Sequence, residues 1–276
     1  MRILITGKNG FMGKELTKHF ISRGYDVVAI GREDLELTDG EAVNKFFRGM
    51  YPLDAVFHCA IVGVTLKGPT DTLNQNLLAF ENLKSHIHPR TKLVVFGSGA
   101  EFDMSKDIDR KDSYDLGQSV PTDWYGLSKY IITQRMIGSN NSDCNNCYVL
   151  RLFGCFGPTE LDRRFIKSAI RCLATNKTFI LEQDKYMDFF YIKDVLKVCE
   201  DILWYGTCKT NPLNAINLVY EEKFKLTQIL STVDPNLKYE VKKQGLGLSY
   251  TGRCDLYQKH LIGLQGGIDE MRTALL

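Results

Sequence analysis

The stretch RILITGKNGFMG, residues 2–13, decides the fold that we expect for this chain. Residues 2–6 predict a short strand, and residues 10–23 predict a helix. Between them, Gly7, Gly10 and Gly13 stand in G-x-x-G-x-x-G spacing. In such a loop the first glycine permits a tight turn, the second lets the backbone approach a pyrophosphate, and the third lets helix and strand pack closely. The helix N-terminus adds unpaired N–H groups for phosphate, so the stretch predicts a dinucleotide site.

The alternation of strand and helix continues through the first half of the chain. Further strands are predicted at 25–31, 54–60, 92–98 and 147–154, and further helices at 40–50, 70–87 and 123–138. Strands of this kind, apolar on both sides, are typical of a parallel sheet that is covered on both faces. We therefore predict an α/β fold: a Rossmann-type doubly wound parallel sheet with a smaller C-terminal α/β lobe. The dinucleotide-binding domain is expected at 1–158 and 187–209, and the substrate-binding lobe at 159–186 and 210–276.

Bulk composition excludes several classes of protein. Of the 276 residues 44% are hydrophobic and 25% charged, which is typical of a globular protein with a sizeable core. The 35 basic and 33 acidic residues give a net charge of only +2, so neither nucleic acid nor a membrane surface is an expected partner. The N-terminus does not resemble a secretory signal, and a cytoplasmic location is expected. The single C-x-x-C, at 144–147, lacks a second ligand pair, so no metal site is predicted.

The end of the second predicted strand bears on the choice of cofactor. Arg32 is the first charged residue there, and its planar fork suits a ribose 2′-phosphate. NADP(H) is therefore preferred. The alternative is that Glu33 or Asp34 binds the ribose hydroxyls, which leaves NAD(H) open.

Taken together, these motifs resemble those of the extended short-chain dehydrogenase/reductase family, or NAD-dependent epimerase/dehydratase family. Within it the chain looks like the nucleotide-sugar reductases, notably GDP-L-fucose synthase and dTDP-4-dehydrorhamnose reductase. The matching segments run in the family's order over residues 2 to about 200: GKNGFMG, REDLELTDGEAVNKFF, DAVFHCA, VVFGSGAEF, WYGLSK, LRLFGCFGP and DFFYIKDV.

The resemblance implies a catalytic trio. Tyr-x-x-x-Lys spacing occurs at 125/129, 205/209 and 239/243, but only the first pair lies on the helix after the fourth predicted strand, which ends in Ser98. Tyr125 and Lys129 are one helical turn apart and face the same way. The lysine ammonium favours the phenolate of a tyrosine whose ordinary pKa is near 10, and the serine hydroxyl can donate to a developing oxyanion.

Further site residues follow from the resemblance, motif by motif. It places the cofactor against Gly7, Asn9, Gly10, Phe11, Met12, Gly13, Arg32, Glu36, Leu37, Cys59, Ala60, Tyr125, Lys129 and Leu152. It places the substrate against Ser98, Gly99, Ala100, Arg164, Lys185 and Arg253. Dimerisation through the helices at 70–87 and 123–138 is also implied, without an independent signal in the sequence.

Departures from the family pattern narrow the expected reaction. Gly99 and Ala100 replace the Asp–Glu pair of the sugar dehydratases, and they cannot transfer protons. Ala100 and Arg164 stand where GDP-L-fucose synthase has its epimerising cysteine and histidine. Met187 replaces an arginine that contacts the substrate diphosphate, so Arg163, Arg164, Lys185 and Arg253 are the candidates for that charge.

These residues predict an NADPH-dependent reductase of a nucleotide-linked 4-keto-6-deoxy sugar, with hydride added at C4 and a proton given by Tyr125. Two alternatives stay open. One is an NAD-dependent nucleotide-sugar 4-epimerase with the same trio. The other is a non-catalytic, cofactor-sensing protein, against which the retained tyrosine and lysine argue.

Overall fold

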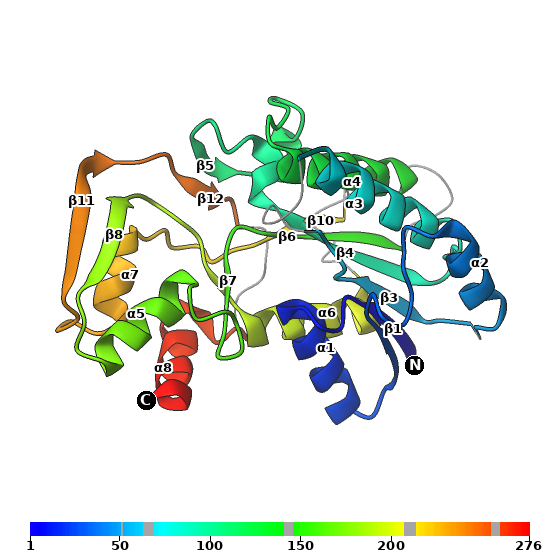
Figure 1. The fold of residues 1–276 in the computed structure, drawn as a ribbon, viewed down its shortest axis with the longest axis horizontal. Coiled ribbons are helices and arrows are strands. Elements are labelled where there is room, and N and C mark those ends of the chain that lie inside the picture. Colours follow the sequence, from blue (N-terminus) through cyan, green and yellow to red (C-terminus); the bar gives the residue numbers. More distant parts are fainter. Residues whose placement is uncertain (51, 63–68, 141–145, 207–213, 255–259) are drawn as a thin grey trace. The chain divides into compact units, whose positions relative to one another are not determined.

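The computed structural model describes the chain except for residues 51, 63–68, 141–145, 207–213 and 255–259 (Figure 1). Cys144 of the C-x-x-C and Lys209 lie outside the described residues. The chain divides into two compact units. The first contains 1–105, 113–151 and 199–216, and the second contains 106–112, 152–198 and 217–276. Which stretches bind cofactor and which bind substrate stays a prediction.

The first unit is built on a six-stranded sheet in the order β10-β6-β4-β3-β1-β2. The strands are β1 (Arg2–Thr6), β2 (Asp26–Ile30), β3 (Ala55–His58), β4 (Lys92–Ser98), β6 (Cys147–Leu152) and β10 (Ala215–Leu218). β1 runs parallel to both β2 and β3, and β3 runs parallel to β4. The predicted α/β fold with a doubly wound sheet is confirmed. The last strand, β10, was not predicted as a strand.

Helices cover both faces of this sheet. They are α1 (Phe11–Ser22), α2 (Gly40–Arg48), α3 (Pro69–Lys84) and α4 (Trp124–Asn140), with the short 3₁₀ helices η1 (Gly99–Phe102) and η2 (Ser113–Asp115). Figure 1 shows α2, α3 and α4 side by side on one face and α1 on the other. Between α3 and the sheet, the core contains the fully buried side chains of Leu4, Val56 and Phe80.

The order of the strands creates a switch point next to β1. The chain passes from β1 to β2 on one side and then returns to place β3 on the other side. In open α/β sheets, ligands bind outside the carboxyl ends of the strands at such a point. The loops that follow β1, β2 and β3 are therefore where a site is expected.

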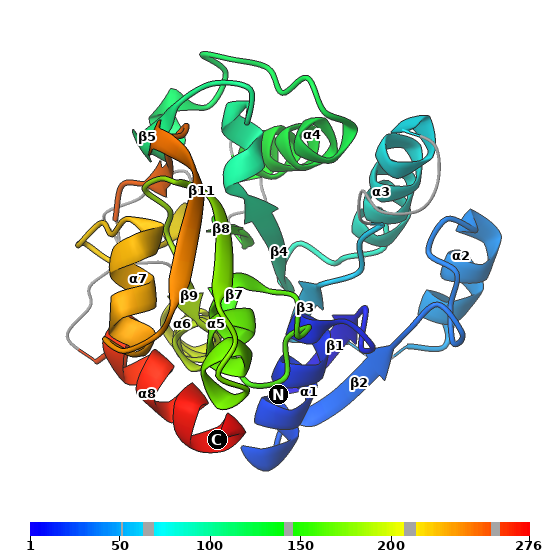
Figure 2. The ribbon, with the colours of Figure 1, turned by 60° about the vertical axis from the view of Figure 1, so that its left-hand side comes forward.

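The second unit combines small paired strands with packed helices. Its elements are β5 (Ile108–Lys111), β7 (Cys155–Phe156), α5 (Phe165–Ala174), β8 (Phe179–Asp184), β9 (Phe190–Tyr191), α7 (Leu226–Val233), β11 (Tyr239–Leu246), β12 (Tyr250–Gly252) and α8 (Gly263–Leu275). Helix α6 (Ile192–Tyr205) begins in this unit and ends in the first. Figure 2 shows β8 beside β11, and α5, α7 and α8 pack against one another. No helix within the described ranges is long and apolar enough to cross a bilayer.

Candidate active site

The loop between β1 and α1 requires glycine at two of its three predicted positions. Gly7 has φ +71°, and a Cβ there would lie 2.6 Å from the backbone nitrogen of Ala60. A Cβ on Gly13 would lie 2.2 Å from the carbonyl oxygen of Gly7, which is also backbone. Only glycine tolerates such contacts, so the sequence brings β1, β3 and the start of α1 within direct backbone contact.

The first turn of α1 forms a cradle of the kind that holds phosphate. Its N-cap, Gly10, is extended and has no side-chain capping bond, so the N-terminal N–H groups of the helix are not covered by a cap. The N–H of Gly10 itself donates to the carbonyl of Gly7 (2.9 Å), which fixes the turn. Phe11 and Met12 lie in this first turn. The loop and the helix N-terminus fit a pyrophosphate.

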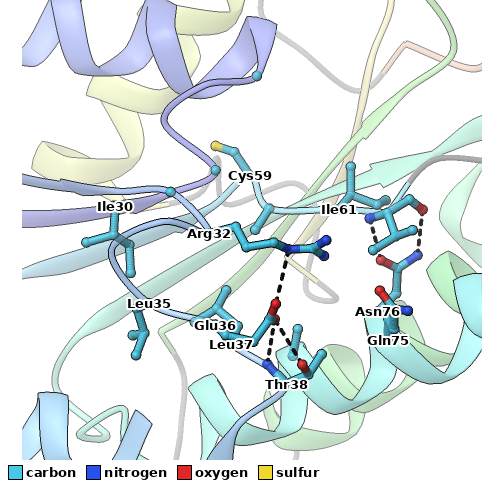
Figure 3. Close-up of a pocket in the computed structure, with 16 residues that line it drawn as sticks. Ile30, Arg32, Leu35, Glu36, Leu37, Thr38, Cys59, Ile61, Gln75 and Asn76 are labelled. Atoms are coloured by element: carbon cyan, nitrogen blue, oxygen red, sulfur yellow. Dashed lines mark hydrogen bonds and ion pairs between the residues drawn. The ribbon is translucent and has the colours of Figure 1, made fainter. Parts of the chain in front are cut away.

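A pocket of about 420 Å³ opens at the switch point. Its walls come from the ends of β1, β2 and β3 and from α3 (Figure 3). Seven of the predicted cofactor residues line it: Gly7, Gly10, Arg32, Glu36, Leu37, Cys59 and Ala60. The other predicted cofactor residues, Asn9, Phe11, Met12, Gly13, Tyr125, Lys129 and Leu152, are not among its lining residues.

The lining also includes residues that the sequence analysis did not select. They are Ile30, Gly31, Leu35, Thr38, Ile61, Val62, Gln75, Asn76 and Ala79. Those next to the ends of β2 and β3 follow from the position of the predicted strands. Asn76 is buried in α3, where its amide accepts from the backbone N–H of Val62 (2.8 Å) and donates to the carbonyl of Val62 (3.1 Å). An asparagine at a helix position where apolar residues are expected is the signal that would have identified it.

Arg32 lines the pocket and forms an ion pair with Glu36. Its Nε is 3.1 Å from a carboxylate oxygen of Glu36. The other oxygen of Glu36 accepts from the hydroxyl (2.9 Å) and the backbone N–H (3.2 Å) of Thr38, as Figure 3 shows. The pair therefore places a guanidinium and a carboxylate together at the wall that faces a bound ribose in the predicted cofactor pose.

The other acidic residues of this loop are engaged by the glycine loop. Lys8 Nζ lies 2.5 Å from Asp34 and 3.3 Å from Glu33, and Asn9 donates to both oxygens of Glu33 (2.8 and 3.0 Å). The backbone N–H of Gly31 and the ammonium of Lys8 hold the pKa of Asp34 below its ordinary value. Hydrogen bonds from the backbone and from Asn9 lower the pKa of Glu33. Both carboxylates are thus charged and bound to the protein.

The three predicted catalytic residues lie in the first unit, around the end of β4. Tyr125 and Lys129 are on α4. In the first turn of this helix, the N–H of Gly126 donates to the Asp123 carboxylate (2.7 Å). Lys129 Nζ donates to the carbonyl oxygen of Phe96 (2.5 Å), two residues before Ser98. The lysine therefore reaches the strand that ends in the serine.

Gly126 allows the serine segment to approach the tyrosine. A Cβ on Gly126 would lie 2.7 Å from the carbonyl oxygen of Ala100, so η1 packs directly against α4 beside Tyr125. Ser98 is buried and caps η1, since its hydroxyl accepts from the N–H of Ala100 (3.2 Å). The structure thus brings the Ser98–Ala100 segment, Tyr125 and Lys129 to one place.

Burial sets the protonation of the groups around Lys129. Burial lowers the pKa of Lys129 to about 8, while the Glu101 carboxylate opposes this shift. Burial also lowers the pKa of His58 to about 3 and raises the pKa of the Cys59 thiol. At neutral pH His58 and Cys59 are therefore uncharged, and an ammonium that can lose its proton near neutrality stands one turn from a tyrosine.

The other two Tyr-x-x-x-Lys matches have different surroundings. Tyr205 is the last residue of α6 and is 83% exposed. Tyr239 and Lys243 lie on strand β11, where Lys243 pairs with Glu182 at 2.9 Å. A strand rises about 3.3 Å per residue, so residues four apart on β11 are not neighbours as they are on a helix.

The predicted substrate cations lie in the second unit. The Nε of Arg164 is 3.8 Å from Glu160, and Arg253 is 2.8 Å from Asp112. Lys185 places its ammonium 5.9 Å from the ring centre of Tyr250, and burial lowers its pKa. Whether any of them contacts a substrate stays a prediction.

Comparison with known proteins identifies the family. Residues 3–204 match the model of the NAD dependent epimerase/dehydratase family. The chain belongs to this family. The resemblance predicted from the motifs is confirmed.

Individual relatives of this family member are distant. GDP-L-fucose synthase of Sinorhizobium fredii is 28% identical over 135 residues, 46% of this chain and 43% of that protein. The chain spans about half the length of the curated relatives that it matches.

Two solved structures share the fold. The GDP-mannoheptose C4 reductase of Campylobacter jejuni, with NADP bound, has a TM-score of 0.80 and 20% identity over 99% of this chain and 98% of that one. The UDP-glucose 4-epimerase of Thermus thermophilus, with NAD, has a TM-score of 0.74 and 18% identity over the same shares.

Proposed function

We propose that this protein is an NADPH-dependent reductase of a nucleotide-linked 4-keto-6-deoxy sugar. The observation that carries the proposal is the placement of Ser98, Tyr125 and Lys129 around the end of β4, in the unit whose switch-point pocket has a phosphate cradle and Arg32. The family and the nucleotide-sugar enzymes that share the fold support this class of reaction.

The proposed chemistry assigns one task to each residue. A bound nicotinamide cofactor would supply the hydride for C4. Tyr125 gives its phenolic proton to the carbonyl oxygen, and Ser98 donates a hydrogen bond to that oxygen as negative charge develops. The Lys129 ammonium stabilises the phenolate that remains.

Preference for NADPH is proposed from the charges at the ribose wall. Glu33 and Asp34 are bound by Lys8, Asn9 and the N–H of Gly31, which leaves Arg32 and Glu36 as the charged groups of the pocket lining. The nitrogens at the end of the Arg32 fork suit a 2′-phosphate.

The first experiment is a fluorescence titration of NADPH and NADH against wild type and Arg32→Ala. We expect wild type to prefer NADPH, and Arg32→Ala to lose about ten- to a hundredfold in NADPH affinity with NADH binding unchanged. Arg23→Ala is the matched control, because Arg23 is similarly exposed (57% against 62%) and also pairs with a glutamate, Glu200. NADH binding as tightly as NADPH to wild type would contradict the cofactor assignment.

The second experiment tests catalysis with a panel of 4-keto nucleotide sugars. Tyr125→Phe keeps the ring and removes only the hydroxyl, so it should lower turnover by about 10²-fold or more and should lower NADPH affinity far less. Tyr130→Phe, on the same helix, is the control. Full turnover by Tyr125→Phe would show that Tyr125 is not the proton donor, and no turnover of any sugar by wild type would favour the non-catalytic alternative.

A nucleotide-sugar 4-epimerase is the second candidate, because one observation favours it. The carboxylate of Glu36 lines the pocket beside Arg32 and could accept a ribose 2′-hydroxyl of NAD. NAD(H) that stays bound through purification, with interconversion of 4-epimers, would establish this activity over reduction.

A further inference from the structure

Glu101 stands at the centre of a buried network behind the proposed catalytic serine. It lies in η1, and its side chain is fully buried. One carboxylate oxygen accepts from the backbone N–H of Ser98 at 2.8 Å. The other lies 2.9 Å from Nε of Arg151, whose side chain is also fully buried. The carboxylate thus connects the end of β4 to β6.

The surrounding residues hold this pair in one geometry. Nη1 of Arg151 donates to the Ser113 hydroxyl (3.1 Å), which in turn donates to the carbonyl of Ala215 (2.6 Å). The guanidinium also lies 4.9 Å from the ring centre of Phe102, the neighbour of Glu101 in η1. A cation over an aromatic face is attracted to it, so η1 is attached to Arg151 through two successive side chains.

Gly97 makes the approach of the carboxylate possible. A Cβ at Gly97 would lie 2.5 Å from Oε1 of Glu101, the oxygen that accepts from Ser98. A Cβ there would also lie 2.9 Å from Cγ1 of Val149, so a side chain at 97 would displace this methyl group as well as the carboxylate oxygen. Gly97 therefore leaves the space that the Glu101 carboxylate needs to accept from the N–H of Ser98.

A buried ion pair is not needed for stability alone. Desolvation of two charges offsets most of their attraction, and well-packed apolar residues often replace such a pair without loss. The pair lies directly behind the serine that is proposed to donate to the substrate oxygen, so it imposes a geometry and a charge at that place.

The charge of Glu101 also acts on Lys129. The Glu101 carboxylate on η1 raises the pKa of Lys129, which opposes the effect of burial. Two titratable neighbours of Lys129, His58 at the end of β3 and Cys59 next to it, are uncharged at neutral pH, and the carbonyl of Phe96 on β4 accepts from its ammonium. Helix α3 contributes the amide of Asn76, bonded to the hydroxyl of Ser128 (3.2 Å), and Tyr125 stands one turn earlier on α4. On β6, Arg151 is the cation that pairs with Glu101.

We propose that Glu101 is a positioning residue for the catalytic trio: held by Arg151, it fixes the backbone of Ser98 and places a carboxylate beside the segment of β4 whose Phe96 carbonyl holds the ammonium of Lys129. The catalytic part of this inference rests on the proposed function. The effects of Glu101 on the backbone of Ser98 and on the pKa of Lys129 do not rest on it, because both can be measured without a substrate.

The test compares Glu101→Gln with wild type by NMR. In protein with ¹⁵N-labelled lysine, the Nζ shift of Lys129, assigned with Lys129→Arg, is followed against pH. Removing the negative charge should move the titration midpoint of Lys129 to lower pH. Ser113→Ala is the control, because it loosens the same network beyond Arg151 without changing a charge, and its midpoint should equal that of wild type.

A second variant separates position from folding. Gly97→Ala removes no polar group but should displace Oε1 of Glu101, so the N–H of Ser98 should exchange with solvent at least about tenfold faster, and turnover should fall about ten- to a hundredfold with NADPH affinity unchanged. If Glu101→Gln does not fold, the exchange rate of the Ser98 N–H in Gly97→Ala tests the proposal by itself. An unmoved Lys129 midpoint in Glu101→Gln, or unchanged Ser98 exchange in Gly97→Ala, overturns the proposal. Both NMR changes without ketoreductase activity in wild type would support the positioning role and refute the proposed reaction.

Discussion

Gly13→Ala offers the sharpest test of the glycine loop, with Gly138→Ala as its partner. Both glycines lie in helices, α1 and α4, where alanine is ordinarily favoured by about 1 kcal/mol. A Cβ on Gly138 meets no atom within 4 Å, whereas a Cβ on Gly13 would lie 2.2 Å from the carbonyl oxygen of Gly7. The same substitution should therefore have opposite effects at the two sites.

The size of the effect follows from what must move. Ordinary contacts of a Cβ begin near 3.4 Å, so Gly13→Ala overlaps a backbone atom by more than 1 Å. Overpacking costs typically about 1–3 kcal/mol, and here the obstacle is a turn that is itself held by a backbone hydrogen bond. We expect Gly13→Ala to lower the free energy of unfolding by about 2 kcal/mol, and Gly138→Ala to raise it by about 0.5–1 kcal/mol.

Urea unfolding, followed by far-ultraviolet circular dichroism, measures both values. NADPH titration of the folded variants adds a second readout, in which Gly13→Ala should bind at least about tenfold more weakly and Gly138→Ala should equal wild type. A Gly13→Ala protein as stable as Gly138→Ala, with wild-type NADPH affinity, would refute the close backbone contact.

Two further predictions concern buried charge. Burial lowers the pKa of His58 in the folded protein to about 3, so as pH falls from neutrality the unfolded chain protonates this histidine first and the folded state loses stability. His58→Gln should therefore reduce the loss of unfolding free energy between pH 7 and pH 5 by about 2 kcal/mol. Urea titrations at the two pH values measure this difference. Burial raises the pKa of Asp188 to about 6, and its buried partner Lys223, 2.9 Å away, opposes the shift. Lys223→Met should therefore cost about 3 kcal/mol at pH 8, where Asp188 must be charged, and clearly less at pH 5; an equal cost at both pH values would show that the ion pair is not responsible.

Much of the first unit was predictable because its signals are local. The strand predicted at 92–98 has those bounds, and the helix predicted at 123–138 is α4, Trp124–Asn140. Hydrophobic runs and glycine spacing reflect the backbone of their own segment, so they can be read without the rest of the chain. The helix predicted at 70–87 ends earlier, at Lys84, since helix ends depend on capping contacts more than on periodicity.

The site was predictable only in part. Local spacing gave three Tyr-x-x-x-Lys pairs, and the family resemblance selected Tyr125 and Lys129 among them. The end of the second predicted strand selected Arg32. Asn76 was missed because its role comes from Val62, 14 residues away.

The sequence by itself determined the class of fold, the glycine loop and the family, because each depends on residues close together in the chain. Only the tertiary structure decided which charged side chains are already paired within the protein. It bound Glu33 and Asp34 to Lys8 and Asn9, and it joined Glu101 to Arg151 across 50 residues of sequence. Such pairings arise when the sheet brings distant segments together, and local periodicity does not encode them. The Glu101–Arg151 pair is fully buried, whereas Lys8, Glu33 and Asp34 are partly exposed.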